Sequence, residues 1–273
     1  MRASERGHQL TRHSFFGYDT NEALHISDAE KKILEDCLQA VHRLEGQGRA
    51  ADLKEVAAFA RITPSSASRA LGELQARGLV QNGNPDRVTL TEEGQRQAVG
   101  VLRRHRLSER LFADILGLPW DRVHDEAMRL EHALTPEAEA RLVTLLNHPE
   151  TCPHGGPIPA ADGSLAPPAT RSLGQVPVGA RVWIQQIIEE EAALLRYLAS
   201  LGLLPGAELR VQEVAPFGGP LLVQVGDARY ALGRDVAAKI LVREEQGAPE
   251  RRRLRARRRG RHGAGHEDLV GGD

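Results

Sequence analysis

The sequence predicts a mainly α-helical protein that ends in a small β-barrel. Aromatic residues make up only 4% of the 273 residues, so the core must rest on Leu, Val, Ile and Ala, which suits packed helices. Apolar residues recur at helical spacing through the first half of the chain, and short β-like runs follow a segment rich in Pro and Gly. A chain of this length has room for two or three domains.

The two ends of the chain differ from the rest in composition. Residues 1–26 are polar and without periodicity, and we expect a disordered N-terminal extension. Residues 246–273 contain eight arginines and are expected to form a disordered Arg-rich tail. The tail either binds nucleic acid nonspecifically through counterion release or stays solvated without a fixed partner. The remainder is acidic, so its bulk charge does not predict a nucleic-acid binder.

Cysteine usage and hydropathy predict a cytoplasmic protein. The two cysteines, Cys37 and Cys152, do not suggest a disulfide framework, which fits a reducing compartment. No apolar run approaches the roughly 18 residues that span a bilayer. The N-terminal residues lack the apolar core of a signal peptide. We therefore expect no membrane partner.

Residues 27–92 are expected to form a winged helix-turn-helix domain. A first helix carries apolar residues at helical spacing. Two short helices follow, the second capped by Thr63 and opened by Pro64, with a tight turn between them that is typical of a helix-turn-helix. Two short apolar runs then flank Asn82-Gly83, a dipeptide that favours a hairpin turn. This hairpin would be the wing.

The helix that begins at Pro64 would enter the major groove of DNA, where its N-terminal end contacts base edges. The candidate DNA contacts are Thr63, Ser65, Ser66, Ser68 and Arg69 at this helix, and Arg87 on the wing. Serine and threonine can donate to phosphates or bases, and arginine can contact guanine through two donors. Hydroxyl groups at this place also cap helices, and the sequence leaves both roles open.

Three further helices are expected in residues 93–147. Thr91 caps the first, which runs to about residue 117, Pro119 opens the second, and Thr135-Pro136 opens the third. On the first, His105 and Glu109 are four residues apart and share a face.

The second of these helices carries several possible metal ligands on one flank. At about 100° per residue, His124, Met128, Glu131 and His132 fall within about 100° of arc. Imidazole and carboxylate groups suit divalent first-row metals, and a thioether adds softness. The same residue types also occur on ordinary polar helix faces, so spacing alone leaves a metal site and a solvated surface equally open.

The end of the chain predicts a linker and a second domain. Residues 148–175 are rich in Pro, Gly and Ala and are expected to be a linker. Residues 176–245 contain the strand-like runs "RVWIQQI", "ELRVQEV", "LLVQVG" and "RYALG" and the helix "EAALLRYLASLG". A β-barrel of this size can hold its own core.

From Asp28 to about Leu146 the sequence resembles the diphtheria toxin repressor family of metal-dependent bacterial regulators. Residues 105–134, "HRLSERLFADILGLPWDRVHDEAMRLEHAL", are similar to the family's dimerisation and metal-binding helices. The positions with the family's ligand spacing are His105, Glu109, His124, Glu131 and His132. The resemblance implies that the C-terminal barrel is a Src-homology-3-like (FeoA-like) domain.

The resemblance also implies two metal sites. The primary, activating site would comprise Asp36, Met128, Glu131 and His132. The ancillary site would comprise His105, Glu109 and His124, with Gln186 and Glu189 as the nearest matches to ligands that the barrel lends in iron-type members. In manganese-sensing relatives the residue matching His105 helps to bridge a paired-metal cluster.

The metal is suggested by departures from the family pattern. Manganese-type members resemble this chain in having Asp at position 36, but they carry Glu at 128 and 39, where this chain has Met128 and Gln39. Iron-type members carry Met at 36 and Cys at 128. Oxygen ligands favour manganese and a thioether favours later metals. We expect Mn²⁺, with Fe²⁺ as the alternative and other divalent metals binding in vitro.

The expected function is metal-activated repression of metal-uptake genes by a homodimer on a palindromic double-stranded operator. Metal would neutralise Asp36, Glu109 and Glu131 and tie the first helix to the dimerisation helices, setting two recognition helices about 34 Å apart. One alternative is a hydrolase that activates water at a His/Glu site. It lacks a recognisable nucleophile or substrate motif, so neither an enzyme nor a small-molecule substrate is expected. Metal-independent DNA binding is the other alternative.

Overall fold

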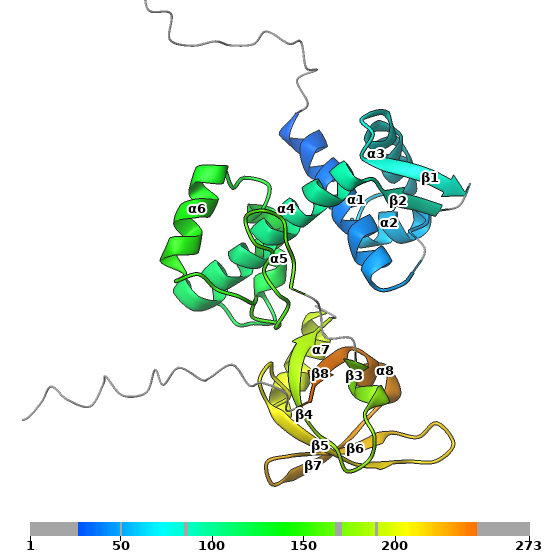
Figure 1. Cartoon of the computed structure of the whole chain (residues 1–273), viewed down its shortest axis with the longest axis vertical. Helices are drawn as coiled ribbons and strands as arrows, with labels where there is room; N and C mark the ends of the chain where they lie inside the picture. The colour runs from blue at the N-terminus through cyan, green and yellow to red at the C-terminus, as the bar shows by residue number, and fades with distance from the viewer. Residues whose placement is uncertain (1–26, 50, 85–86, 167–170, 189–190, 245–273) are drawn as a thin grey trace, which may run out of the picture. The chain divides into compact units, whose positions relative to one another are not determined.

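The computed structural model describes residues 27–49, 51–84, 87–166, 171–188 and 191–244, and it divides into two compact units, Met1–Gln95 and Arg96–Asp273 (Figure 1). The two ends that the sequence predicts to be disordered lie outside the described residues. So does Glu189, a predicted ligand. No helix in the described part of the chain is long and apolar enough to cross a bilayer.

The first unit is a winged helix-turn-helix. Its elements are α1 (Asp28–Gly46), α2 (Leu53–Phe59), α3 (Pro64–Ala76), β1 (Val80–Asn84) and β2 (Arg87–Leu90). The α1 helix begins with a capping box, in which the Ser27 hydroxyl accepts from the Glu30 amide and the Glu30 carboxylate accepts from the Ser27 amide. Buried aliphatic residues of the three helices, among them Leu38, Leu44 and Leu74, form the core. The predicted helix-turn-helix is present.

The wing differs from its prediction at Asn82-Gly83. These residues lie within β1, which pairs antiparallel with β2, and the register shifts between Asn82 and Asn84. Gly83 therefore occupies a bulge rather than a turn, because glycine accommodates the irregular backbone of a bulge. Asn84 still pairs with Arg87, so Asn82-Gly83 is not the turn between the two strands, and residues 85–86 lie outside the described residues.

The start of α4 (Glu92–Arg110) packs directly on the connection between α3 and β1. The Thr91 hydroxyl donates to the Gly78 carbonyl at 2.7 Å, and its oxygen accepts from the Gly94 amide at 3.0 Å. A Cβ atom at Gly94 would lie 1.9 Å from the Leu79 carbonyl oxygen. Position 94 must therefore be glycine for the two backbones to approach this closely.

The helices of the second unit are shorter than predicted. After α4 come the π-helical turn η1 (Leu111–Ile115), α5 (Val123–Leu130) and α6 (Pro136–Leu145). The buried Ser108 hydroxyl donates to the Arg104 carbonyl at 2.8 Å, a back-bond of the kind that bends helices, and η1 follows. Glu131 is the C-cap of α5, with its amide still donating to the Ala127 carbonyl, and residues Glu131–Ala133 form a turn. The predicted helix cannot continue through Thr135, because Pro136 keeps that residue extended.

An antiparallel sheet that curls around one core completes the second unit (Figure 1). Its elements are β3 (Arg171–Ser172), η2 (Leu173–Gln175), β4 (Arg181–Ile187), α7 (Ala192–Ser200), β5 (Glu208–Val214), β6 (Leu221–Val225), β7 (Ala228–Leu232), α8 (Arg234–Ala238) and β8 (Ile240–Arg243). The strand order is β3-β8-β4-β5-β6-β7. The four predicted strands and the predicted helix are present, whereas β3 and β8 were not predicted because they are too short to show periodicity.

Candidate metal centre

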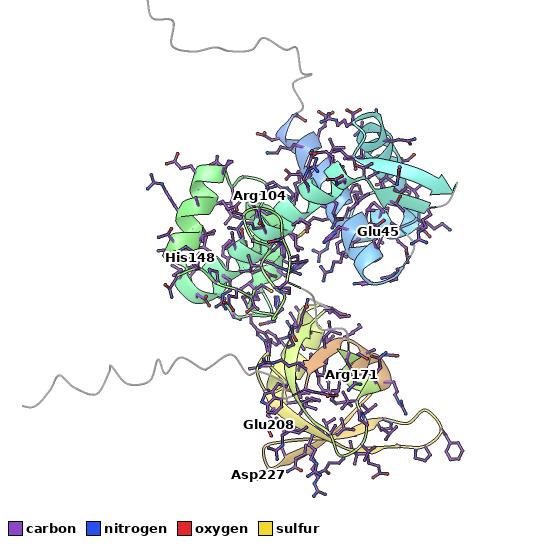
Figure 2. All side chains as sticks on the ribbon, viewed as in Figure 1. Glu45, Arg104, His148, Arg171, Glu208 and Asp227 are labelled. Atoms are coloured by element: carbon purple, nitrogen blue, oxygen red, sulfur yellow. The ribbon has the colours of Figure 1, made fainter. Side chains whose placement is uncertain are left out.

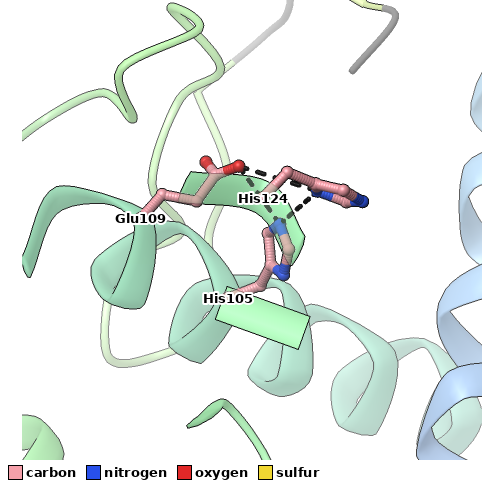
Figure 3. Close-up of side chains that lie close together, drawn as sticks. All are labelled: His105, Glu109 and His124. Carbon is pink, nitrogen blue, oxygen red and sulfur yellow. Dashed lines mark hydrogen bonds and ion pairs between the residues drawn. The ribbon is translucent and has the colours of Figure 1, made fainter. Parts of the chain in front are cut away.

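The α4 and α5 helices bring His105, Glu109 and His124 together (Figure 3). His105 and Glu109 lie one turn apart on α4, and His105 Nε2 is 3.2 Å from Glu109 Oε1. His124 lies in the first turn of α5, with its Nδ1 atom 3.2 Å from His105 Nε2 and 3.8 Å from Glu109 Oε1. The structure thus groups the three residues that the family resemblance assigns to the ancillary site.

Two residues that the sequence analysis missed complete this cluster. Cys152 and His154 lie in the segment after α6, and they form a second possible ligand group with Glu109. His154 Nδ1 is 3.2 Å from Glu109 Oε1, and the His154 side chain is 1% exposed. The sequence signal was a cysteine and a histidine two residues apart in a segment that was interpreted only as a linker.

The segment that carries Cys152 and His154 is irregular but firmly held. The Cys152 amide donates to the Gly156 carbonyl at 2.8 Å, and the Gly155 amide donates to the Cys152 carbonyl at 2.9 Å. Arg106 of α4 donates to the Pro157 carbonyl. These bonds fold residues 152–156 into a compact turn whose side chains face α4, so the predicted linker begins with part of the site.

Opposite charges stabilise each other inside the cluster. Burial opposes the imidazolium form of His105, but Glu109 and Glu131 outweigh burial and raise the pKa of His105 well above its usual value. Burial likewise disfavours the Glu109 carboxylate, but His105, His124 and His154 hold its pKa well below the usual value. The negative charges of Glu109 and Glu131, which bound metal is expected to neutralise, are therefore offset by a charged His105 in the metal-free protein.

His154 and Cys152 carry protons that a metal would displace. Burial opposes the charged form of His154, but its contacts with Cys152 and Glu109 raise its pKa to about 11. Burial and the nearby Glu109 charge raise the pKa of the Cys152 thiol. Both residues are thus protonated near neutral pH, and a metal ligand must be deprotonated.

The donor set fits a divalent cation. Glu109 is 0% exposed, and neither of its oxygens makes a hydrogen bond of good geometry, although three imidazoles surround it. The same holds for His154 Nδ1. Buried polar atoms are normally hydrogen-bonded, so buried donor atoms that converge without such bonds are typical of a site that can hold a cation. Imidazole, carboxylate and thiolate ligands together suit first-row transition metals.

Glu131 and His132 form a neighbouring group in the turn after α5. Glu131 is 0% exposed, its Oε2 atom is 2.5 Å from His105 Nδ1, and its Oε1 atom is 3.2 Å from His132 Nε2. Arg104, labelled in Figure 2, donates from Nε to the Glu131 carbonyl at 2.9 Å. Met128 is half-buried on the last turn of α5. His105 therefore contacts both buried carboxylates.

Two further predicted ligands, Asp36 and Gln186, lie on α1 and β4. Asp36 is buried on α1 of the first unit, with Lys32 Nζ 3.3 Å from its Oδ2 atom. Gln186 lies in β4 next to a bulge, and its Cα atom would be 3.1 Å from a Cβ atom at Gly155. Its backbone is thus beside the segment that carries Cys152 and His154.

The candidate DNA contacts surround the start of α3 and the wing. Thr63 Oγ1 accepts from the Ser66 amide at 3.2 Å, so the Thr63 hydroxyl caps the helix, and it also lies 3.0 Å from Ser65 Oγ. Ser68 and Arg69 are exposed on α3, and Arg87 is exposed on β2. The capping role that the sequence left open is therefore present, and the exposed side chains are available to a ligand.

A winged helix-turn-helix unit and a buried group of histidines and carboxylates define a metal-binding protein with a nucleic-acid-binding fold. Residues 91–160 match the family described as "Iron dependent repressor, metal binding and dimerisation domain", and residues 171–244 match the FeoA domain. The chain belongs to the diphtheria toxin repressor family of metal-dependent transcriptional regulators.

Individual relatives agree with this assignment. The chain is 32% identical over 222 residues to the iron-dependent repressor IdeR of Mycobacterium bovis, which covers 75% of this chain and 94% of the relative. It is 31% identical over 186 residues to the diphtheria toxin repressor of Corynebacterium diphtheriae, and this alignment covers 64% of the present chain and 82% of the relative. A solved manganese-dependent transcriptional repressor in complex with manganese matches with a TM-score of 0.72 at 34% identity, covering 77% and 99%. The predicted family and fold class are confirmed.

Proposed function

We propose that this protein is a metal-activated repressor that binds double-stranded operator DNA as a homodimer and controls metal-uptake genes. The observation that carries the proposal is the fully buried Glu109 carboxylate with His105, His124 and His154 around it. It lies in a chain that also contains an exposed recognition helix. One polypeptide thus contains candidate residues for binding metal and candidate residues for binding DNA.

We propose that a first metal ion is held by Asp36, Met128, Glu131 and His132. The structure supports the second-unit part of this set, because Glu131 and His132 are already 3.2 Å apart at the end of α5. Asp36 would bring α1 to this ion, and its negative charge would be neutralised there. Metal can shift the protein toward the DNA-binding state only by its differential affinity for the two states, at about 1.4 kcal/mol per tenfold.

A second ion would be held by the Glu109 group, with His105, His124, Cys152 and His154 as candidate ligands. Manganese remains the expected activating metal and Fe²⁺ the alternative, since Asp36 and Glu131 supply hard oxygens. The Cys152 thiolate is a softer ligand, so the Glu109 group should prefer iron, cobalt or zinc over manganese. Gln186 and Glu189 stay proposed contributors from the barrel.

Dimerisation is supported by exposed apolar side chains in the second unit. Ile115 and Leu116, at the end of η1, are 50% and 55% exposed, and Leu145, at the end of α6, is 60% exposed. Exposed large apolar side chains, such as those of the adjacent Ile115 and Leu116, are typical of interaction surfaces. A dimer with twofold symmetry would bind a palindromic operator with half-sites about one DNA turn apart.

Gel-shift titrations test the proposal. DNA selected from a random-sequence library with the Mn²⁺-loaded protein would be titrated with the full-length protein and Mn²⁺, Fe²⁺ or Zn²⁺, with and without a chelator. Chelation should abolish binding. The variant Arg69→Ala should lose DNA binding but keep its metal, whereas Glu131→Gln should lose DNA binding and the metal ion proposed at Glu131 and His132. DNA binding that is indifferent to chelation would instead support a metal-independent winged-helix protein.

A further inference from the structure

The segment that carries Cys152 and His154 contacts the barrel as well as α4. The Ile187 amide of β4 donates to the His154 carbonyl at 2.9 Å. Gly155 has a φ angle of +86°, and a Cβ atom there would lie 1.9 Å from the Gln185 carbonyl oxygen. The backbones of the segment and of β4 therefore meet without an intervening side chain, at the bulge of β4.

Trp120 lies on the other side of His154. Its carbonyl oxygen is 2.8 Å from His154 Nε2, and the two rings are 5.5 Å apart at 37°. The same indole ring packs against the hydrophobic core of the barrel. The next residue, Asp121, forms an ion pair with Arg196 of α7 at 3.0 Å. One turn between η1 and α5 thus contacts both the His154 ring and the barrel.

These contacts determine which nitrogen of His154 faces the ligand group. The carbonyl of Trp120 can only accept, so Nε2 carries a proton and donates to it. Nδ1 is then the atom that faces Glu109 Oε1 at 3.2 Å. A hydrogen bond to the second ring nitrogen commonly fixes the tautomer and orientation of a metal-ligating histidine, and removing such support weakens metal affinity about 10–100-fold.

We propose that Trp120 is a positioning residue that couples metal occupancy of the Glu109–Cys152–His154 group to packing of the barrel. The proposal rests on the proposed second metal ion. Packing of the barrel on the Trp120 ring holds its backbone carbonyl against His154, and β4 holds the carbonyl of His154 itself. An ion that fixes His154 therefore also fixes the barrel, and by linkage a packed barrel raises the affinity for that ion.

Cobalt titration of the full-length protein measures this coupling. Co²⁺ bound by a thiolate gives a charge-transfer absorption, and its loss in Cys152→Ser would assign it to this group. Trp120→Ala should weaken the affinity read from this absorption about tenfold, and Trp120→Phe less than about threefold, because a phenyl ring still packs. Gly155→Ala should weaken it about tenfold through the contact with Gln185. Phe217→Ala, which removes a fully exposed ring from the barrel, should leave it unchanged.

A second measurement leaves Trp120 intact. The chain has two tryptophans, so Trp183→Phe makes Trp120 the only indole emitter. Its emission should change on Zn²⁺ binding, and Cys152→Ser should abolish the change. An unchanged emission together with wild-type affinity in Trp120→Ala would overturn the coupling while the metal site stands. Absence of any Cys152-dependent cobalt absorption would overturn the metal site and the coupling together.

Discussion

Glu109 and Glu131 are both fully buried carboxylates that contact His105, yet their surroundings differ. Glu109 has three imidazoles around it and no hydrogen bond of good geometry. Glu131 has a 2.5 Å contact with His105, and its backbone carbonyl is bound by Arg104. Glu109 is therefore ready to receive a cation, whereas Glu131 is already held in position by protein groups. The two residues should respond differently to substitution.

Exchanging each carboxylate for an amide tests this difference most strongly. Glu109→Gln should weaken Co²⁺ binding at the Cys152 group by at least about 100-fold, because it removes the carboxylate that interacts with all three imidazoles. Glu131→Gln should leave the same affinity within about threefold. The Cys152-dependent cobalt absorption measures the Co²⁺ affinity of both variants. Equal losses in the two variants would show that the carboxylates belong to one inseparable site.

His105 joins the two carboxylates, so its loss should affect both metal ions. The ligands proposed for the first ion, Asp36, Met128, Glu131 and His132, are called the Glu131 group here. His105→Gln should weaken Co²⁺ binding at the Glu109 group and Mn²⁺ binding at the Glu131 group, each about 10–100-fold. Isothermal titration with each metal measures the two affinities. His148→Gln, a substitution on an exposed histidine after α6, is the matched control. A loss confined to one metal would assign His105 to a single site.

The raised pKa values of His105 and His154 predict proton release on metal binding. Metal affinity at the Glu109 group should rise with pH, about tenfold per unit for each proton displaced, and should continue to rise above pH 6.5 because the pKa of His154 is about 11. In the metal-free protein, the free energy of unfolding changes with pH in the opposite direction. The stabilisation from charged His154 is present below its unfolded pKa and is lost as pH rises toward about 11. Calorimetry in buffers of different ionisation enthalpy counts the protons, and a count of zero contradicts the assignment.

Cys152 should distinguish the two groups by metal preference. Cys152→Ser should weaken Zn²⁺ and Co²⁺ binding at the Glu109 group about tenfold and change Mn²⁺ binding at the Glu131 group less than about threefold, because only the softer metals gain from a thiolate. Competition between Zn²⁺ and a chelating dye gives the affinities. Equal losses for zinc and manganese would place the thiolate at a site that both metals share.

The smallest effect is expected at Arg104, which donates to the Glu131 carbonyl. Arg104→Gln should weaken Mn²⁺ binding at the Glu131 group about threefold through loss of its bond to the Glu131 carbonyl, and should leave the Glu109 group unchanged. Arg122→Gln, on an exposed arginine before α5, is the control. An effect on cobalt absorption would mean that Arg104 acts on both groups.

The sequence predicted most of the fold and the helical ligands, because both depend on local periodicity. His105, Glu109 and His124 were found since helical spacing places them on defined faces. Cys152 and His154 were missed because their placement depends on nonlocal contacts with Arg106 and β4.

Two other differences also have physical causes. The Asn82-Gly83 prediction was wrong because glycine suits a bulge as well as a turn, and pairing with β2 decided between them. The predicted helix stops before Thr135 because Pro136 requires an extended residue before it, and Glu131 becomes the C-cap of α5. In both places a neighbouring element overrode the local signal.

The contact at Gly94 has a consequence for how a signal can travel. The first turn of α4 touches the Leu79 carbonyl so closely that no side chain fits between them, and Thr91 bonds to both sides of this joint. The α3 helix, the first strand of the wing and the start of α4 are consequently joined at this point by closely packed backbone. A conformational change on metal binding is therefore expected at another point of the chain, because the contact between Gly94 and Leu79 leaves no room for movement.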